Sequence, residues 1–235
     1  MKDYDTLDVM PWEELYFYMA STWRQGEHVC LIGPTGCGKT TLARELLPLR
    51  RFVIAFAVKR EDDSLTALGW PIIRDWPLER MYERSILWPK VETLDSFQRQ
   101  HEIMRKALRD IYTRGRWTVY ADDLGYMSNT LKLDREIRAI AQQGRSAKIT
   151  LVSSIQRASW VPVDVYAQVG HLFLWRAGDA RDSKRLTEIA GAGPVDTALM
   201  FYHSRNLPQH GFLYIHVPTG RMVQSELATA DAVVA

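Results

Sequence analysis

A glycine-rich segment near the start of the chain, Gly33 to Thr41, carries the residues best suited to chemistry. It reads Gly-Pro-Thr-Gly-Cys-Gly-Lys-Thr-Thr and matches the pattern G-x-x-x-x-G-K-T. Glycines at this spacing let backbone N–H groups surround a phosphate, the lysine reaches its oxygens, and the threonine hydroxyl ligates Mg²⁺. The pattern predicts a nucleoside triphosphate site in which Lys39 is also catalytic and Thr40 also binds the metal. The predicted nucleotide-binding residues are Gly33, Pro34, Thr35, Gly36, Cys37, Gly38, Lys39, Thr40 and Thr41.

The segments on either side of this loop fit that role. The apolar run Val29 to Ile32 predicts a strand that leads into the loop. Residues 41–47 predict a helix whose N-terminus adds partial positive charge facing the phosphates, and Pro48 ends it. This strand, loop and helix together are far more specific than a glycine-rich turn alone.

A second group of chemical residues follows the β-rich run Trp117 to Ala121. Asp122 and Asp123 come directly after this predicted strand. In a nucleotide hydrolase the first carboxylate of such a pair holds the water shell of Mg²⁺, and the second can orient the attacking water. We therefore expect Asp122 at the metal and both aspartates in catalysis. Asp123 stands where a glutamate is usual, so its shorter side chain must approach the water more closely or act through a second water.

Two further segments are predicted to end at the same edge of the sheet. Residues 145–152 lead into a strand, and Gln156 lies at its carboxyl end, where a neutral amide could sense a γ-phosphate. The charged cluster Lys59 to Asp63 follows another buried strand, 51–58. Because parallel strands place ligands at their carboxyl ends, this cluster either borders the site or forms a solvated loop.

The remaining patterns predict an α/β fold with a mainly parallel central sheet flanked by helices. Residues 11–227 are expected to form a single domain, with flexible ends at 1–10 and 228–235. Helices are expected from Pro11, over 94–114, from Leu131 to Ala141, and over 180–190 and 194–202. Further strands are expected at 85–88 and 170–175, with a closing hairpin over 211–223.

Composition restricts the class of protein. The chain has 235 residues, a net charge of +2 and 46% hydrophobic residues, which is enough to bury a sizeable core. No apolar run reaches the length of a membrane span, and the acidic N-terminus does not resemble a signal peptide. These features, with both cysteines placed where a disulfide would distort the loop, favour a cytoplasmic protein without a membrane span. The small net charge neither requires nor excludes nucleic acid.

In combination, these motifs resemble the FtsK/HerA superfamily of P-loop DNA-translocating ATPases, which includes viral genome-packaging ATPases. The resemblance runs from about Val29 to Gly191. It implies a RecA-like domain that hydrolyses ATP with Mg²⁺, with Gln156 as the sensor and Arg145 as a catalytic arginine finger reaching a neighbouring subunit. The segments that carry it are the phosphate loop, Tyr120 to Asp123, Gln143 to Arg157 and Asp182 to Gly191.

The resemblance also implies a biological role. It suggests a motor that moves DNA, most simply double-stranded, through a homo-oligomeric ring such as a hexamer, with a viral capsid or portal-like component as a further partner. The location would be the host cytoplasm or the virion. Arg145 could instead be a helix-end cation. Other functions also remain open, namely a regulatory P-loop ATPase, a conjugation or DNA-repair pump, or a protein that uses ATP as a structural ligand.

Overall fold

The computed structural model describes residues 7–76, 82–93, 95–166, 168–176, 179–190 and 195–227. Within this part of the chain, nine strands form one sheet in the order β3-β4-β2-β5-β6-β1-β7-β8-β9. The pairs from β3 to β7 are parallel, and the pairs β7–β8 and β8–β9 are antiparallel. The predicted α/β class and the closing hairpin are therefore confirmed, and the hairpin continues the main sheet.

Most elements agree with the predicted segments, but the short elements α3 and β3 were not predicted. The strands are β1 (His28–Ile32), β2 (Val53–Phe56), β3 (Ile72–Ile73), β4 (Arg84–Leu87), β5 (Thr118–Ala121), β6 (Thr150–Ile155), β7 (Val169–Leu174), β8 (Gly211–His216) and β9 (Arg221–Glu226). The α-helices are α1 (Trp12–Thr22), α2 (Lys39–Leu46), α3 (Asp63–Thr66), α4 (Ser96–Arg114), α5 (Asp134–Gln143), α6 (Ala180–Ala190) and α7 (Thr197–Arg205). A π-helical turn spans Tyr126–Thr130, and short 3₁₀ turns span Leu47–Leu49, Ala158–Trp160 and Val163–Tyr166.

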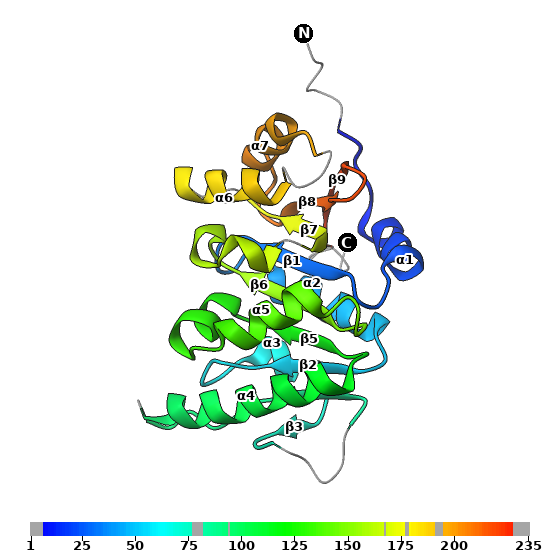
Figure 1. The fold of residues 1–235 in the computed structure, drawn as a ribbon. Coiled ribbons are helices and arrows are strands. Elements are labelled where there is room, and N and C mark those ends of the chain that lie inside the picture. The colour runs from blue at the N-terminus through cyan, green and yellow to red at the C-terminus, as the bar shows by residue number, and fades with distance from the viewer. Residues whose placement is uncertain are drawn as a thin grey trace.

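Helices cover both faces of the sheet. Successive side chains of a strand point to opposite faces, so Cys30 and Ile32 pack in one hydrophobic cluster while Val29 and Leu31 pack in another. The first cluster includes residues of α4, α5 and α6, and the second includes residues of α1 and α2. Figure 1 shows α4 and α5 side by side over the same face of the sheet. Burial on both faces explains why β1 is apolar at nearly every position.

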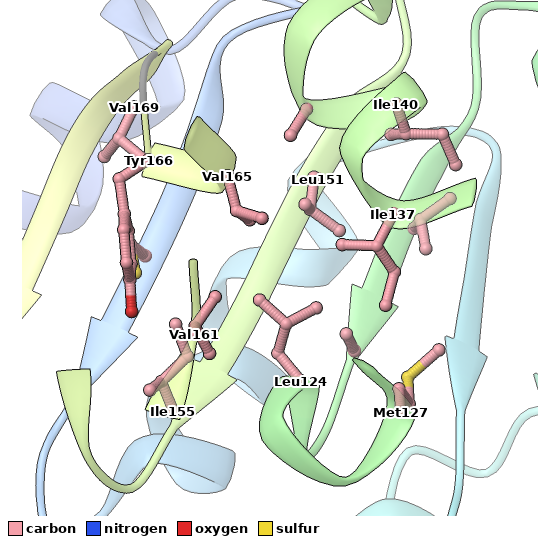
Figure 2. Packing of buried hydrophobic residues seen from close by; sticks show 14 of the residues in the cluster. Leu124, Met127, Ile137, Ile140, Leu151, Ile155, Val161, Val165, Tyr166 and Val169 are labelled. Carbon is pink, nitrogen blue, oxygen red and sulfur yellow. The ribbon is translucent and has the colours of Figure 1, made fainter. Parts of the chain in front are cut away.

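The packing of α5 against β6 fixes the strand that carries Gln156. Ile137 and Ile140 of α5 lie over Leu151 of β6, and Leu124 and Met127 close the same cluster (Figure 2). All five side chains are at most 3% exposed. Close packing of this kind leaves a strand little freedom to shift, so the position of its carboxyl end is well defined.

Two segments differ from the prediction. Asp8 and Met10 exchange backbone hydrogen bonds with Gln224 of β9, so the expectation of a flexible end applies only to residues 1–6. Those residues, like the predicted tail 228–235 and the expected helix positions 94 and 194, lie outside the described residues. Helix α5 begins at Asp134 rather than near Leu131 because Lys132 has a positive φ of 53°. Among the described residues, no helix is both long and apolar enough to cross a membrane.

Candidate active site

The phosphate-type loop connects β1 to α2, as the sequence predicts. Its residues 33–38 follow the last residue of β1, and α2 begins at Lys39. Gly38 has a φ of 105°, a left-handed conformation that favours glycine over other residues. The N–H groups of the first turn of α2 have no partner within the helix and carry its partial positive charge. The loop and helix end therefore form a concave site suited to an anion.

Lys39 lies inside this loop. Its side chain is buried, and Nζ donates hydrogen bonds to the carbonyl oxygens of Gly33 and Pro34, both at 2.7 Å. Burial lowers the pKa of Lys39 and raises the pKa of the nearby Cys37 thiol. The ammonium group is thus held by weak neutral acceptors that phosphate oxygens can replace with a gain in charge-assisted bonding.

Asp122 lies opposite the start of α2. Its side chain is buried, and Oδ1 accepts hydrogen bonds from the hydroxyl of Tyr120 at 3.0 Å and that of Thr40 at 3.3 Å. Burial raises the pKa of Asp122, while contact with the Lys59 ammonium opposes that change. Oxygen donors of this type are the ligands that Mg²⁺ prefers. Thr40 and Asp122 therefore suit a metal that also binds phosphate, although Asp122 Oδ2 is in ionic contact with Lys59 in this structure.

Asp123 and Gln156 contact each other. Gln156 Nε2 donates to Asp123 Oδ2 at 3.1 Å, and the Tyr126 backbone N–H donates to Asp123 Oδ1 at 2.9 Å. This contact exists because β6 lies between β1 and β5, so the carboxyl end of β6 falls between the loop and the two aspartates. Gln156 and Lys39 therefore line the same cavity, with Gln156 in direct contact with Asp123.

Lys59 also belongs to this site. Its Nζ lies 2.8 Å from Asp122 Oδ2 and 2.8 Å from Asp62 Oδ2. Asp62 in turn accepts a hydrogen bond from the backbone N–H of Leu65 and caps α3. Burial tends to lower the pKa of Lys59, but its contacts with Asp122 and Asp62 outweigh this and raise the pKa. Of the two alternatives for this charged cluster, the structure supports the one that borders the site.

One cavity of about 300 Å³ joins most of these groups. It contains most of the predicted site residues together with Ser64 and Ser154, which no spacing in the sequence indicated. Its lining residues are Thr35, Gly36, Gly38, Lys39, Thr40, Thr41, Lys59, Ser64, Asp122, Asp123, Ser154 and Gln156. Gly33, Pro34 and Cys37 complete the loop outside this lining. The combination of an anion cradle, a metal-suited carboxylate and a second carboxylate is suited to phosphoryl transfer.

Arg145 lies at the amino ends of the strands, on the side of the sheet opposite the cavity. It precedes β6, whereas the cavity lies beyond the carboxyl ends of β1, β5 and β6. The side chain is exposed. Arg145 therefore does not join the site of its own chain. A finger that acts on a neighbouring copy requires this arrangement, and a helix-end cation is also compatible with it. Arg157, next to Gln156, is instead paired with Asp179 and Asp182 of the same chain.

Comparisons with known proteins identify similar folds. No family model and no curated protein sequence matches the chain. Among solved structures, the DNA-packaging ATPase B204 of Sulfolobus turreted icosahedral virus is similar, with a TM-score of 0.64, 16% identity, and 88% of this chain and 100% of that chain covered. The genome-packaging NTPase B204 of Sulfolobus turreted icosahedral virus 2, in complex with AMPPCP, has a TM-score of 0.62 and 15% identity, with 87% of this chain and 100% of that chain covered. VirB4 of Thermoanaerobacter pseudethanolicus has a TM-score of 0.63 and 11% identity, with 88% of this chain and 90% of that chain covered.

These likenesses extend over almost the whole of each chain, and they confirm the predicted fold. They include a viral packaging ATPase, the kind of protein that the sequence motifs resemble. At these identities they establish the fold alone, so the chemistry of this chain has to be argued from its own residues.

Proposed function

We propose that this chain is an ATP-hydrolysing motor of the FtsK/HerA type that moves DNA, with Mg²⁺-ATP bound in the cavity beside Lys39. The observation that carries this proposal is the meeting of four groups at one edge of the sheet. Lys39 and Thr40 begin α2 directly after the loop, Asp122 follows β5 and Gln156 follows β6, and Asp123 contacts Gln156. Each has the chemistry that its place in nucleotide hydrolysis requires.

The proposed roles follow from the chemistry of each side chain. Lys39 and the loop N–H groups bind the β- and γ-phosphates, and Thr40 and Asp122 hold Mg²⁺, which neutralises charge on the phosphates when bound. Asp123 accepts a proton from a water molecule as the water oxygen attacks the γ-phosphorus, and ADP leaves. Gln156 reports whether the γ-phosphate is present. Arg145 of a neighbouring copy stabilises the charge that develops on the transferred phosphoryl group.

The partners are proposed on the same basis. The packaging ATPases among the structural neighbours support DNA as the cargo, double-stranded in the simplest case. A site completed by a neighbour supports a closed ring such as a hexamer. A capsid or portal-like component would then receive the DNA, in the host cytoplasm or on the virion. A conjugation-type or DNA-repair pump of the same superfamily is the alternative role.

The first test is ATP hydrolysis by the purified protein over a concentration series, with and without double-stranded DNA. A DNA motor with sites completed by neighbours gives turnover per chain that rises with both protein and DNA concentration. Turnover that depends on neither would contradict the proposal and indicate a regulatory ATPase.

A second candidate function is a protein that uses ATP as a structural ligand. The observation that favours it is Asp123, a shorter acid than the usual glutamate, whose two oxygens already accept hydrogen bonds from Gln156 and Tyr126. Tight nucleotide binding with no turnover under any condition would support this candidate.

A further inference from the structure

Three loops at the amino ends of the central strands are joined to one another by hydrogen bonds. They span residues 23–27, 115–117 and 144–149 and precede β1, β5 and β6, which are neighbours in the sheet. Gln25 Nε2 donates to the carbonyl oxygens of Trp117 and Lys148, both at 3.0 Å. The Arg116 N–H donates to the Ala147 carbonyl at 2.9 Å. We call these three loops the amino-edge platform, and Arg145 is part of it.

The platform holds two residues in an unfavourable backbone conformation. Arg116 and Lys148 have φ values of 61° and 56°, in the left-handed region. Within the described residues, Lys132 is the one other non-glycine residue with positive φ. Side chains with a Cβ are disfavoured there, and such residues persist where the surroundings fix them, frequently at functional sites. Both platform residues are basic, and both lie in loops next to Arg145.

The platform also carries uncompensated positive charge. Arg116, Arg145 and Lys148 are exposed, and no carboxylate lies within ion-pair distance of any of them in the part of the chain that the structure describes. Exposed cations on a rigid backbone attract an anionic partner at little cost in conformational entropy.

The opposite edge of the sheet has the complementary charge. Asp122 and Asp123 lie there beside Lys39 and Lys59, and the proposed triphosphate would make the site negative overall. About 20 Å of strand separates the two edges, so a chain cannot bring its own platform to its own site. In a ring of identical subunits packed head to tail, one edge of each copy meets the other edge of the next.

We propose that Arg116 and Lys148 act with Arg145 on the nucleotide site of a neighbouring copy, and that their left-handed conformations are retained to present these two cations to it. This inference rests on the proposed function and extends it. The partner of the platform is a second copy of this chain with nucleotide bound. The platform is thus a contact surface built from three loops, and it presents three cations, namely Arg116, Lys148 and the proposed finger Arg145.

The test exploits the backbone conformation. Glycine removes both the charge and the strain, so Lys148→Gly and Arg116→Gly should leave the Tm unchanged or raise it by up to about 4 °C. Each should nevertheless lower ATP turnover about tenfold or more, the effect of losing one charged contact. Lys148→Arg keeps the charge and should keep most of the turnover. The matched control Lys132→Gly has the same change in charge and backbone but should retain wild-type turnover.

Mixing and sedimentation experiments assign the effect to a neighbour. Adding the Lys39→Ala variant, which has an intact platform and a disabled site, should restore part of the turnover of Lys148→Gly. With a non-hydrolysable ATP analogue, both glycine variants should require at least about threefold more protein than the wild type to self-associate, because a charged contact is lost.

Each contrary result has a distinct meaning. Wild-type turnover and self-association in both glycine variants would overturn the inference and leave the proposed function intact. Loss of turnover that mixing cannot restore would also overturn it, since the platform would then act within its own chain. Weaker binding of double-stranded DNA with unchanged DNA-free turnover would make the platform a DNA surface instead. Failure of the wild type to bind ATP would refute the proposed function itself.

Discussion

Lys59 places an ammonium group 2.8 Å from Asp122 Oδ2, where the proposed reaction needs a divalent cation. Two positive charges at one carboxylate repel each other, so binding of Mg²⁺ has to displace Lys59 or weaken its contact. Half of the Lys59 side chain is exposed, which gives it a solvated position to move to. Lys59 therefore neutralises the buried Asp122 when the metal is absent.

This competition gives a prediction for Lys59→Ala. Without the ammonium group, we expect the Mg²⁺ concentration needed for half-maximal binding of a fluorescent ATP analogue to fall by about two- to tenfold, the effect of a partly exposed ion pair. Lys90→Ala, which removes an exposed lysine paired with Glu92, is the control and should leave the Mg²⁺ requirement unchanged. A higher Mg²⁺ requirement in Lys59→Ala would instead mean that Lys59 binds the phosphates.

Asp123 gives a second prediction at this scale. Asn at position 123 keeps the contact with the Tyr126 N–H but cannot take a proton from water. We expect Asp123→Asn to bind ATP as the wild type does and to lose turnover by about 10²-fold or more. Asp123→Glu restores the usual acid and should retain turnover. Equal turnover in Asp123→Asn and the wild type would exclude Asp123 as the base.

At the scale of elements, β1 joins the functional loop at one end to a buried histidine at the other. His28 Nε2 lies 3.1 Å from the carbonyl oxygen of Ala141 in α5, and Nδ1 accepts a hydrogen bond from the Leu151 N–H of β6 at 3.0 Å. The neutral ring with its proton on Nε2 satisfies both contacts. Burial lowers the pKa of His28 from 6.5 to about 4.

This shift predicts a pH dependence of stability. Because the folded-state pKa lies below the ordinary value, the unfolded chain binds a proton first as the pH falls. Stability from this group is complete above pH 6.5 and is lost progressively down to pH 4, by about 3 kcal/mol. Urea unfolding at several pH values should show a flatter profile for His28→Gln than for the wild type. Identical profiles for His28→Gln and the wild type would refute the assignment.

At the scale of the whole molecule, the sheet separates Arg145 from the site in its own chain. Arg145 and the phosphate loop lie at opposite ends of the neighbouring strands β6 and β1, so the proposed finger can act only on the site of another copy. Figure 1 shows these strands lying side by side in the middle of the molecule. Under the proposed function, activity is therefore expected to depend on assembly of several copies.

The prediction at this scale concerns Arg145→Ala. We expect it to bind ATP with nearly wild-type affinity and to lose turnover by about 10³-fold or more, the usual effect of removing an arginine finger. Mixed with Lys39→Ala, which supplies intact fingers but no nucleotide site, it should regain part of that turnover. Absence of rescue at every mixing ratio would support the alternative in which Arg145 is a helix-end cation.

The sequence by itself determined the parts of this protein whose chemistry is local. The spacing of Gly33, Gly38 and Lys39 predicted a loop between a strand and a helix, because backbone conformation and hydrogen bonding within one segment dictate that pattern. Apolar runs predicted β5 and β6, and Asp122 and Gln156 were expected at one edge because parallel strands end together.

Tertiary structure decided what depends on the order of strands. Only the position of β6 between β1 and β5 brings Gln156 to Asp123, and only the neighbouring position of β2 brings Lys59 to Asp122. The contacts of Arg116 with Ala147 and of Gln25 with Lys148 likewise join loops that are distant in sequence. Such contacts depend on which strands pair across the sheet, and the pattern of apolar residues within a single strand does not specify its neighbours.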